Sequence, residues 1–452
     1  MRPVSAVLLA LARARQTSAQ FGSQHPLTTR AIADAHDAVV RLVEQRGTLR
    51  VLIWEEVFYV ERTLLLEDSV RLDALLTDMT DRGVGLIEVR PGVQPWELGL
   101  FVDFLTLPLP EARRVGPLAF LRQQRVRHLL VRPVRVLADD ELAGVRRDPL
   151  DVYRAALRVV DDLFLRATNA MPLVLKRAHQ VVATLIDVLR DDPVTLQAHA
   201  ACRAYDETSR HHPVNVAVVA LLVGLRAGLD RDRLVTLGLA ALLHDIGKAR
   251  VPREVLLKPD RLTADERAVV ARHTVEGAYL LRELTGQARL AMVVAFEHHA
   301  HFDRSGYPPL VAKTAPNPLA RVVEVAEFYD AATHAARGLR RPMLPSDAVR
   351  LVLARAGQLF DPVVAEVFAR VVGFYPVGSV VALDGGDVAV VVRPPARRPD
   401  RPVVKVVQAR GAPVVPPHTI DLEAAPERTV VGVLDPDQVA ADIAPAAYLR
   451  SI

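Results

Sequence analysis

The sequence predicts a mainly α-helical protein with an N-terminal α/β domain and a small C-terminal β appendage. Residues 1–150 alternate helix-like and strand-like segments, whereas residues 151–372 show only the apolar spacing of helices. Beyond Gly373, short valine-rich runs separated by turn residues indicate strands. We therefore expect four parts: a mixed α/β domain of unknown role (1–150), a helical connector (151–200), a helical domain that carries the chemistry (201–372) and a β-rich extension (373–452).

Length and composition narrow the class of protein. The 452 residues, 50% of them hydrophobic, are enough for two or three domains. No apolar run reaches the ~18 residues of a membrane span, and Val4–Leu11 resembles a helix rather than a signal peptide. A single cysteine, Cys202, excludes a disulfide framework and favours a cytoplasmic location. Because the net charge is only +4 and the arginines are scattered, we expect no nucleic-acid polymer as a partner.

The N-terminal domain shows clear local signals for secondary structure. Helical spacing over Leu27–Gln45 ends at Gly47, and two strand-like runs flank the turn Glu55-Glu56. The further elements expected here are a helix at Ser69–Arg82, a strand at Val84–Val89, a helix from Gln94 to Leu105 and a strand at His128–Leu137. This part of the sequence has no phosphate loop, nucleophile elbow or metal-ligand spacing, so it indicates no chemistry.

The central region is predicted to be a series of helices. Pro213 is tolerated in a first helical turn and precedes a helix from Val214 to about Ala227. A capping box at Thr263–Glu266 begins a helix that we expect to carry His273. The other helices expected here are Val152–Leu163, Pro172–Leu189, Leu234–His244, Leu290–His301 and Leu319–Ala332.

The C-terminal extension is predicted to contain four strands. Two valine-rich runs flank Asp384-Gly385-Gly386-Asp387, which is a hairpin signal. Val403–Gln408 and Thr429–Leu434 are expected to add a third and a fourth strand, and a short helix is expected after Asp437.

Histidines and carboxylates gather in the central region in a pattern that suits metal ions. Seven of the fourteen histidines fall in the stretch from His211 to His301. We expect His211 and His301, the two ends of this stretch, to lie just outside the site. Neutral imidazoles and carboxylates without a thiolate suit Fe, Mn, Zn or Ni. The candidate ligands are His212, His244, Asp245, His273, His298, His299 and Glu327. Seven ligands are too many for one open catalytic ion and suit two, with Asp245 as the bridge.

Two adjacent metal ions favour hydrolysis of a phosphate ester, because they can activate water and stabilise the attacking and leaving oxygens. His298 and His299 lie about 100° apart if both are helical, so each can serve one ion. On a continuous helix Lys248 projects beside His244, with Asp245 turned away. Lys248 is expected to hold the phosphate or assist the leaving oxygen rather than to bind metal.

Several segments resemble the HD-GYP family of cyclic di-GMP phosphodiesterases, which are HD-superfamily phosphohydrolases. The resemblance rests on His244–Lys248, on His298-His299 and on Phe302–Pro308 with its Gly306-Tyr307-Pro308. Segments that match in order and spacing are Leu256–Pro259, Leu262-Thr263, His273, Pro318–Arg321 and Phe360–Pro362. The resemblance covers the helical domain alone and says nothing about residues 1–150.

The resemblance implies an enzyme of bacterial second-messenger signalling. It implies hydrolysis of cyclic di-GMP to linear pGpG and onward to GMP, with two divalent ions, Fe or Mn before Zn or Ni. Gly306, Tyr307 and Pro308 then shape the substrate pocket beside the ions. Arg337 and Arg340 become candidates for phosphate contact, whereas Arg321 is either an ion-pair partner or a group that supports the site or contacts phosphate. Signalling proteins and a second copy of the chain are the further partners considered.

The sequence also departs from the family pattern. Glu327 stands where the family usually has aspartate, with Asp330 as a second-choice ligand on the same face. In the signature loop, Ala300-His301 replaces Glu-Arg and Arg304 replaces glycine, while Arg337–Pro342 replaces Arg-Pro-Tyr-Arg. Thr208 stands where members with a third metal have glutamate, so two ions are expected. Two alternatives stay open: a phosphohydrolase of another nucleotide, and a catalytically degenerate signalling receptor.

Overall fold

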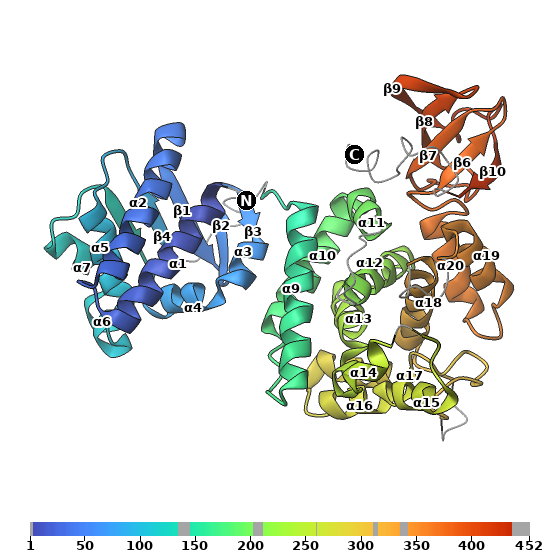
Figure 1. Cartoon of the computed structure of the whole chain (residues 1–452), viewed down its shortest axis with the longest axis horizontal. Helices are drawn as coiled ribbons and strands as arrows, with labels where there is room; N and C mark the ends of the chain where they lie inside the picture. Colours follow the sequence, from blue (N-terminus) through green and yellow to red (C-terminus); the bar gives the residue numbers. More distant parts are fainter. Residues whose placement is uncertain are drawn as a thin grey trace. The chain divides into compact units, whose positions relative to one another are not determined.

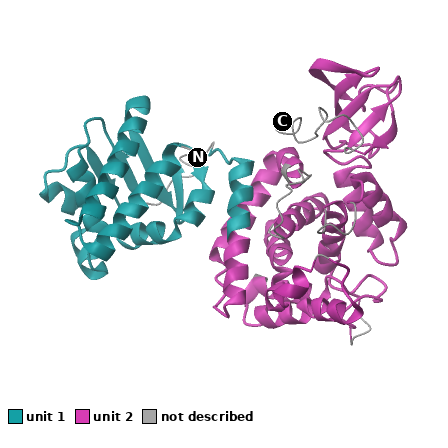
Figure 2. Cartoon of the chain, in the orientation of Figure 1, with its two compact units in different colours: residues 1–158 teal, residues 159–452 magenta. Residues whose placement is uncertain are grey.

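The protein forms two compact units, Met1–Arg158 and Val159–Ile452 (Figure 2). The structure, a computed structural model, describes residues 3–133, 145–201, 211–258, 260–310, 315–334 and 342–435. The first unit combines helices with an antiparallel sheet, and the second is a helical body with a second antiparallel sheet near its C-terminal end (Figure 1). The predicted fold class is therefore confirmed. Among the described helices, none combines the length and apolar character needed to cross a bilayer.

The sheet of the first unit has the strand order β3-β2-β1-β4-β5, and its neighbouring strands are antiparallel. Its strands are β1 (Leu49–Trp54), β2 (Val57–Val60), β3 (Thr63–Leu65), β4 (Leu86–Val89) and β5 (Leu129–Arg132). The predicted hairpin turn is confirmed, because Trp54 pairs with Val57 and both intervening residues, Glu55 and Glu56, have positive φ. The predicted strand His128–Leu137 is described only to Arg132, and its residues from 134 onward lie outside the described ranges.

Helices α1, α2 and α5 pack together in the first unit and share its apolar core with the sheet. The helices are α1 (Pro3–Phe21), α2 (Pro26–Arg46), α3 (Leu66–Arg71), α4 (Asp73–Asp81), α5 (Pro95–Thr106), α6 (Leu109–Val115) and α7 (Pro117–Gln123). Helix α9 (Pro149–Thr168) begins in the first unit and ends in the second. Core residues such as Leu8, Phe58 and Phe101 are fully buried. The expected single helix Ser69–Arg82 is instead the pair α3 and α4, because the backbone leaves helical geometry at Leu72.

The helical body of the second unit is organised around α12 (His211–Arg226), which is buried at every residue from Pro213 to Gly224. It packs against α13 (Arg231–Leu243), α18 (Pro318–Thr333) and α20 (Pro362–Val372). The other helices are α10 (Lys176–Asp191), α11 (Pro193–Ala201), η1 (Ile246–Arg250), α14 (Arg253–Leu256), α15 (Ala264–Ala271), α16 (His273–Leu281), η2 (Gly286–Ala288), α17 (Arg289–Glu297) and α19 (Pro345–Ala354). An apolar helix buried on all sides is a rigid support, so the residues at its first turn are held firmly.

The C-terminal sheet has five strands in the order β10-β6-β7-β8-β9. They are β6 (Val380–Leu383), β7 (Val388–Arg393), β8 (Val403–Ala409), β9 (Ala412–Asp421) and β10 (Val430–Leu434). The predicted hairpin between β6 and β7 is confirmed, with Gly385 and Gly386 both at positive φ. Strand β9 was not predicted, because prolines at 413, 416 and 417 argue against a strand unless it lies at an edge, where β9 does lie. The helix expected after Asp437 lies outside the described residues.

Candidate metal centre

Four candidate ligands lie at helix ends. His212 is the second residue of α12, His244 follows the last residue of α13, His273 begins α16, and His298 follows α17. Two sequence predictions are wrong in detail here. The helix begun by the capping box at Thr263 ends before Arg272, so His273 belongs to the next helix. The predicted helix Leu290–His301 ends at Glu297 instead. The prediction missed this end because apolar spacing alone does not locate a bend.

Lys248 lies on the same side of the chain as Asp245. The α-helix ends at Leu243 and the chain continues as the 3-10 helix η1, which has three residues per turn. Residues three apart therefore share a face, and the Lys248 ammonium forms a short ion pair with Asp245 Oδ2. The expectation that Asp245 turns away from Lys248 assumed a continuous α-helix and is wrong.

Asp245 lies between two sets of imidazole nitrogens. Its Oδ1 is 3.2 Å from His273 Nε2 and 3.9 Å from His298 Nε2. Its Oδ2 is 3.5 Å from His244 Nε2 and 3.7 Å from His212 Nε2. Each oxygen of this buried carboxylate thus has its own pair of nitrogens, which is the position that a bridging ligand requires.

The seven candidate ligands converge in three overlapping groups. His212, His244 and Glu327 form one, His273, His298 and His299 a second, and His244, Asp245 and His298 a third. Within each group the potential ligand atoms lie within 4.8 Å of one another. The first two groups also meet directly, since His299 Nε2 is 3.3 Å from Glu327 Oε1.

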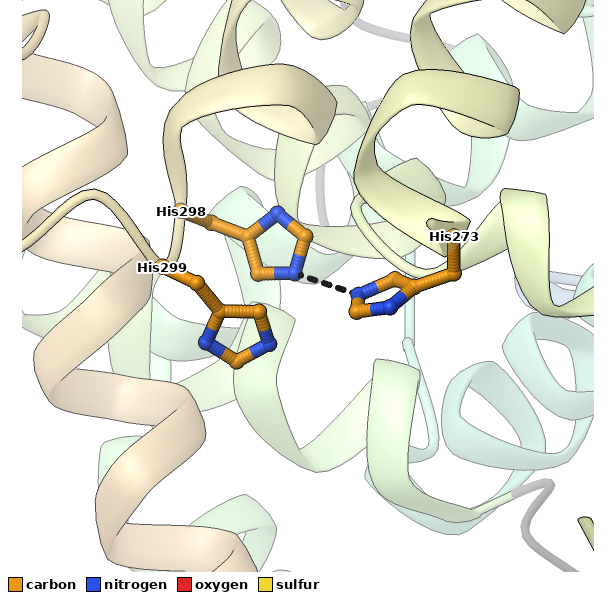
Figure 3. A group of neighbouring side chains, drawn as sticks. All are labelled: His273, His298 and His299. Atoms are coloured by element: carbon orange, nitrogen blue, oxygen red, sulfur yellow. Dashed lines mark hydrogen bonds between the residues drawn. The ribbon is translucent and has the colours of Figure 1, made fainter. Parts of the chain in front are cut away.

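Hydrogen bonds at Nδ1 fix which ring nitrogen can bind a cation. His244, His273 and His298 contact the carbonyl oxygen three residues earlier through Nδ1, at 2.7, 2.7 and 2.9 Å. Each Nδ1 must therefore carry the proton, which leaves a lone pair on Nε2. The Nε2 atoms of His273 and His298 are nevertheless 3.1 Å apart (dashed line in Figure 3), with His299 beside them. Two lone pairs at this distance repel each other unless a cation lies between them.

Two buried atoms of the centre have no hydrogen-bond partner among the described residues: His244 Nε2 and Asp245 Oδ1. Leaving a buried polar atom unpaired costs about 1–3 kcal/mol, so such atoms point to a missing partner. A divalent cation would satisfy both atoms and remove the repulsion between His273 and His298. The nitrogen and oxygen donors, without thiolate, fit Fe, Mn, Zn or Ni.

The electrostatics keep the rings neutral. Burial lowers the pKa of His244 to about 4 and that of His299 to about 2, so both rings can ligate at neutral pH. Burial would raise the pKa of Asp245, but the Lys248 cation and the surrounding histidines hold it well below its usual range. Burial and the nearby Asp245 raise the pKa of Glu327 well above its ordinary value. A metal ion would reverse that balance by binding the carboxylate form.

Asp330 is engaged by neighbouring side chains. It accepts a bond of 2.7 Å from His212 Nδ1, and it also contacts Asn215 and His334. Bonds from His212 and His334 outweigh burial and hold the pKa of Asp330 well below its usual range. From the sequence, Asp330 was predicted only as a second-choice ligand, and Asn215 and His334 were not predicted. The available signal was the spacing of three residues between Glu327 and Asp330, which places both on one helix face.

The loop of residues 300–308 covers one side of the centre. The Tyr307 ring lies 4.7 Å from the His299 ring at an interplanar angle of 35°. Gly306 approaches the backbone so closely that a Cβ there would lie 1.8 Å from the His299 carbonyl oxygen. His301 contacts the buried Glu324 of α18 at 2.6 Å, which ties the loop to that helix. Pro308 is half-buried at the end of the loop.

Arg321 does not point freely into the centre. Its guanidinium donates to Asp361 at 2.7 Å and to the Pro316 carbonyl oxygen at 2.7 Å. These contacts fit the ion-pair role among the alternatives that the sequence left open. The other candidate arginines, Arg337 and Arg340, lie outside the described residues, as do Thr208 and Pro259.

Comparisons with known proteins identify the family. An HD-domain family model matches residues 183–364. A cyclic di-GMP phosphodiesterase of Pseudomonas aeruginosa is 34% identical over 296 residues, which cover 65% of this chain and 70% of that protein. The chain belongs to the HD-GYP family of HD-domain phosphodiesterases.

Two other relatives match over shorter stretches. A cyclic di-GMP phosphodiesterase response regulator of Xanthomonas campestris is 38% identical over 32% of this chain and 38% of its own length. A 3'3'-cGAMP-specific phosphodiesterase of Vibrio cholerae is 32% identical over 27% of this chain and 28% of its own length. These two matches span well under half of each relative.

Comparison with the HD-GYP pattern explains the positive φ of Arg304 in the loop of residues 300–308. Arg304 stands where the family usually has glycine, and its φ of 67° lies in the left-handed region. A residue with a side chain is strained there by roughly 1–2 kcal/mol, whereas glycine is not. The loop thus keeps the backbone shape that suits glycine although the glycine is absent.

Proposed function

We propose that the chain hydrolyses cyclic di-GMP to linear pGpG, and further to GMP, using two divalent metal ions. Fe or Mn is the preferred pair, with Zn or Ni as alternatives. The observation that carries the proposal is the position of Asp245 between two groups of three ligands. The substrate comes from the names of the Pseudomonas and Xanthomonas relatives. The expected cytoplasmic location, homodimer and signalling-protein partners remain predictions.

Each ion has its own ligand group in this proposal. His212, His244 and Glu327 would hold one ion and His273, His298 and His299 the other, with Asp245 shared. When bound, the ions would supply an activated water and stabilise negative charge on the reacting phosphate. The chain's contribution is the fixed orientation of the rings, which the Nδ1 bonds of His244, His273 and His298 provide.

Among the described residues, Lys248 is the cation best placed to meet the substrate phosphate. Its ion pair with Asp245 raises its pKa against the opposing effect of burial, so the charge is retained. Its side chain is 30% exposed, whereas that of Asp245 is 3% exposed, so the ammonium can contact a ligand from the open side. A lysine so placed binds phosphate through charge-assisted hydrogen bonds. Tyr307, whose ring packs at a tilt against that of His299, forms the adjoining wall in this proposal.

Metal content and nucleotide hydrolysis, measured on the same purified chain, test the proposal. We expect two ions per chain and release of pGpG, and we expect both to be diminished in His244→Ala and Asp245→Ala. His418→Ala, which removes an exposed histidine of β9, is the matched control and should keep both properties. Two bound ions with no hydrolysis of any cyclic dinucleotide would contradict the enzyme and favour the signalling receptor.

A different cyclic dinucleotide is the second candidate substrate. The observation that favours it is the similarity to a 3'3'-cGAMP-specific phosphodiesterase, together with the altered loop residues His301 and Arg304. Parallel assays with cyclic di-GMP and 3'3'-cGAMP at equal concentrations separate the two. The substrate with the larger kcat/KM identifies the function.

A further inference from the structure

Asp330 has both carboxylate oxygens committed to other side chains. Oδ2 accepts a hydrogen bond of 2.7 Å from His212 Nδ1. Oδ1 accepts one of 2.9 Å from Asn215 Nδ2 and lies 3.0 Å from His334 Nδ1. Asp330 is only 4% exposed, so these partners replace water around its charge. Such a carboxylate is suited to orienting a ligand rather than to being one.

His212 is oriented differently from three of the other candidate ligands. His244, His273 and His298 are each held by the carbonyl oxygen three residues earlier. For His212, near the start of α12, the contact at Nδ1 is with a side chain instead. That side chain is Asp330 of a different helix, α18, whose carboxylate accepts from His212 Nδ1.

Asp330 is itself held in place by His334. The Nδ1 of His334 contacts Asp330, and its Nε2 contacts the Ala200 carbonyl oxygen of α11 at 3.1 Å. Both ring nitrogens therefore face oxygen atoms, and the ring connects the end of α18 to α11. With Asn215 on α12 as a second contact, the carboxylate has little freedom to rotate.

We infer that Asp330, anchored by Asn215 and His334, is the positioning residue that turns His212 Nε2 toward the metal centre. The inference rests on the proposed two-metal function. Because the Asp330 carboxylate keeps the proton on Nδ1, the lone pair of His212 stays on Nε2. The ion held by His212, His244 and Glu327 therefore depends on Asp330, whereas the ion held by His273, His298 and His299 does not.

Titration of the metal-free full chain with Mn²⁺ alone, without nucleotide, tests this dependence. In Asp330→Asn we expect one equivalent to bind as in the wild type and the other to weaken about 10- to 100-fold, the usual effect of losing an outer carboxylate. His334→Gln should weaken the same equivalent to a smaller degree. Asp361→Asn is the matched control, because this buried carboxylate of the same unit contacts Arg321 and the first turn of α20 and no candidate ligand. Both equivalents should be unchanged in it.

The split between the two equivalents distinguishes positioning from general damage. Wild-type binding of both equivalents in Asp330→Asn would overturn the inference, and so would equal weakening of both, since that indicates loss of fold. A wild-type chain that binds two Mn²⁺ ions but hydrolyses no nucleotide would refute the proposed function and leave this inference standing. A wild-type chain that binds fewer than two would overturn both.

Discussion

The Nε2 atoms of His273 and His298 face each other at 3.1 Å, although the Nδ1 of each ring is the protonated nitrogen. This arrangement is unfavourable in the metal-free protein and favourable around a cation. We therefore expect metal removal to lower the thermal unfolding midpoint, and Mn²⁺ at ~1,000 times its Kd to add about 4 kcal/mol of stability. Differential scanning calorimetry with chelator and with Mn²⁺ measures the difference. Asp245→Ala should show a much smaller difference, and an equal one would argue against metal binding at this centre.

The metal-free protein should become less stable as the pH falls, because His244 binds a proton more readily in the unfolded chain than in the folded one. The unfolded histidine has a pKa near 6.5, and burial lowers that of folded His244 to about 4. Between these values the unfolded state binds more protons, so stability rises with pH and is lost as pH falls from 6.5 to 4. The contribution of His244 is on the order of 3 kcal/mol.

Chemical denaturation at pH 6.5 and pH 4, with chelator present, isolates this contribution. His244→Gln should lose less stability over the interval than the wild type, whereas His418→Gln should lose the same amount. An identical loss in the wild type and His244→Gln would show that His244 does not carry the effect.

Gly247 should tolerate no side chain. A Cβ at this position would lie 1.9 Å from the His273 carbonyl oxygen and 2.4 Å from the Gly277 nitrogen. Both contacts are with backbone, so Gly247→Ala forces η1 away from α16 and should cost about 3 kcal/mol or more. Gly432→Ala in β10 is the control, since no atom lies within 4 Å of its Cβ position. Urea unfolding of both variants gives the comparison, and equal midpoints would contradict the predicted clash.

Loss of the Lys248 charge should affect turnover more than metal content. Lys248→Met removes the cation proposed to contact the phosphate, and we expect kcat to fall about 10²- to 10³-fold. Lys258→Met breaks an ion pair with Glu266 elsewhere in the unit and should leave kcat close to the wild-type value. Metal analysis and steady-state kinetics on both variants decide the point. A Lys248→Met protein with normal kcat would exclude a role in the chemical step.

The sequence was sufficient to predict which candidate ligands lie together, but not their local geometry. His244, Asp245 and His273 are recognisable by residue type and order, and the structure places them together. The side of the chain on which Lys248 lies could not be predicted, because it depends on a change from α-helix to 3-10 helix after Leu243. The apolar pattern likewise does not indicate the bend at Arg272 between α15 and α16.

Tertiary contacts explain the rest of what the sequence missed. Two partners of Asp330, His212 and Asn215, are more than 100 residues away from it in the sequence. No local pattern therefore indicates these contacts. Strand β9 escaped prediction because its prolines are acceptable only at the edge of a sheet, and edge position is a property of the assembled sheet. The described residues of the stretch 1–150 form a sheet and an apolar core, and none of the His/Asp/Glu groups that could hold a metal includes them.

The prolines of β9 also have a consequence for solubility. Pro416 and Pro417 lie where the pairing with β8 shifts register, between Pro413 and His418, and neither can donate a backbone hydrogen bond. An edge strand with a regular row of donors can recruit a strand from another molecule, and that is the first step of many aggregates. Here the longest edge of the C-terminal sheet is interrupted near its middle by two residues that cannot extend such a ladder. The exposed edge strand β9 is therefore a poor template for pairing with a strand of another molecule.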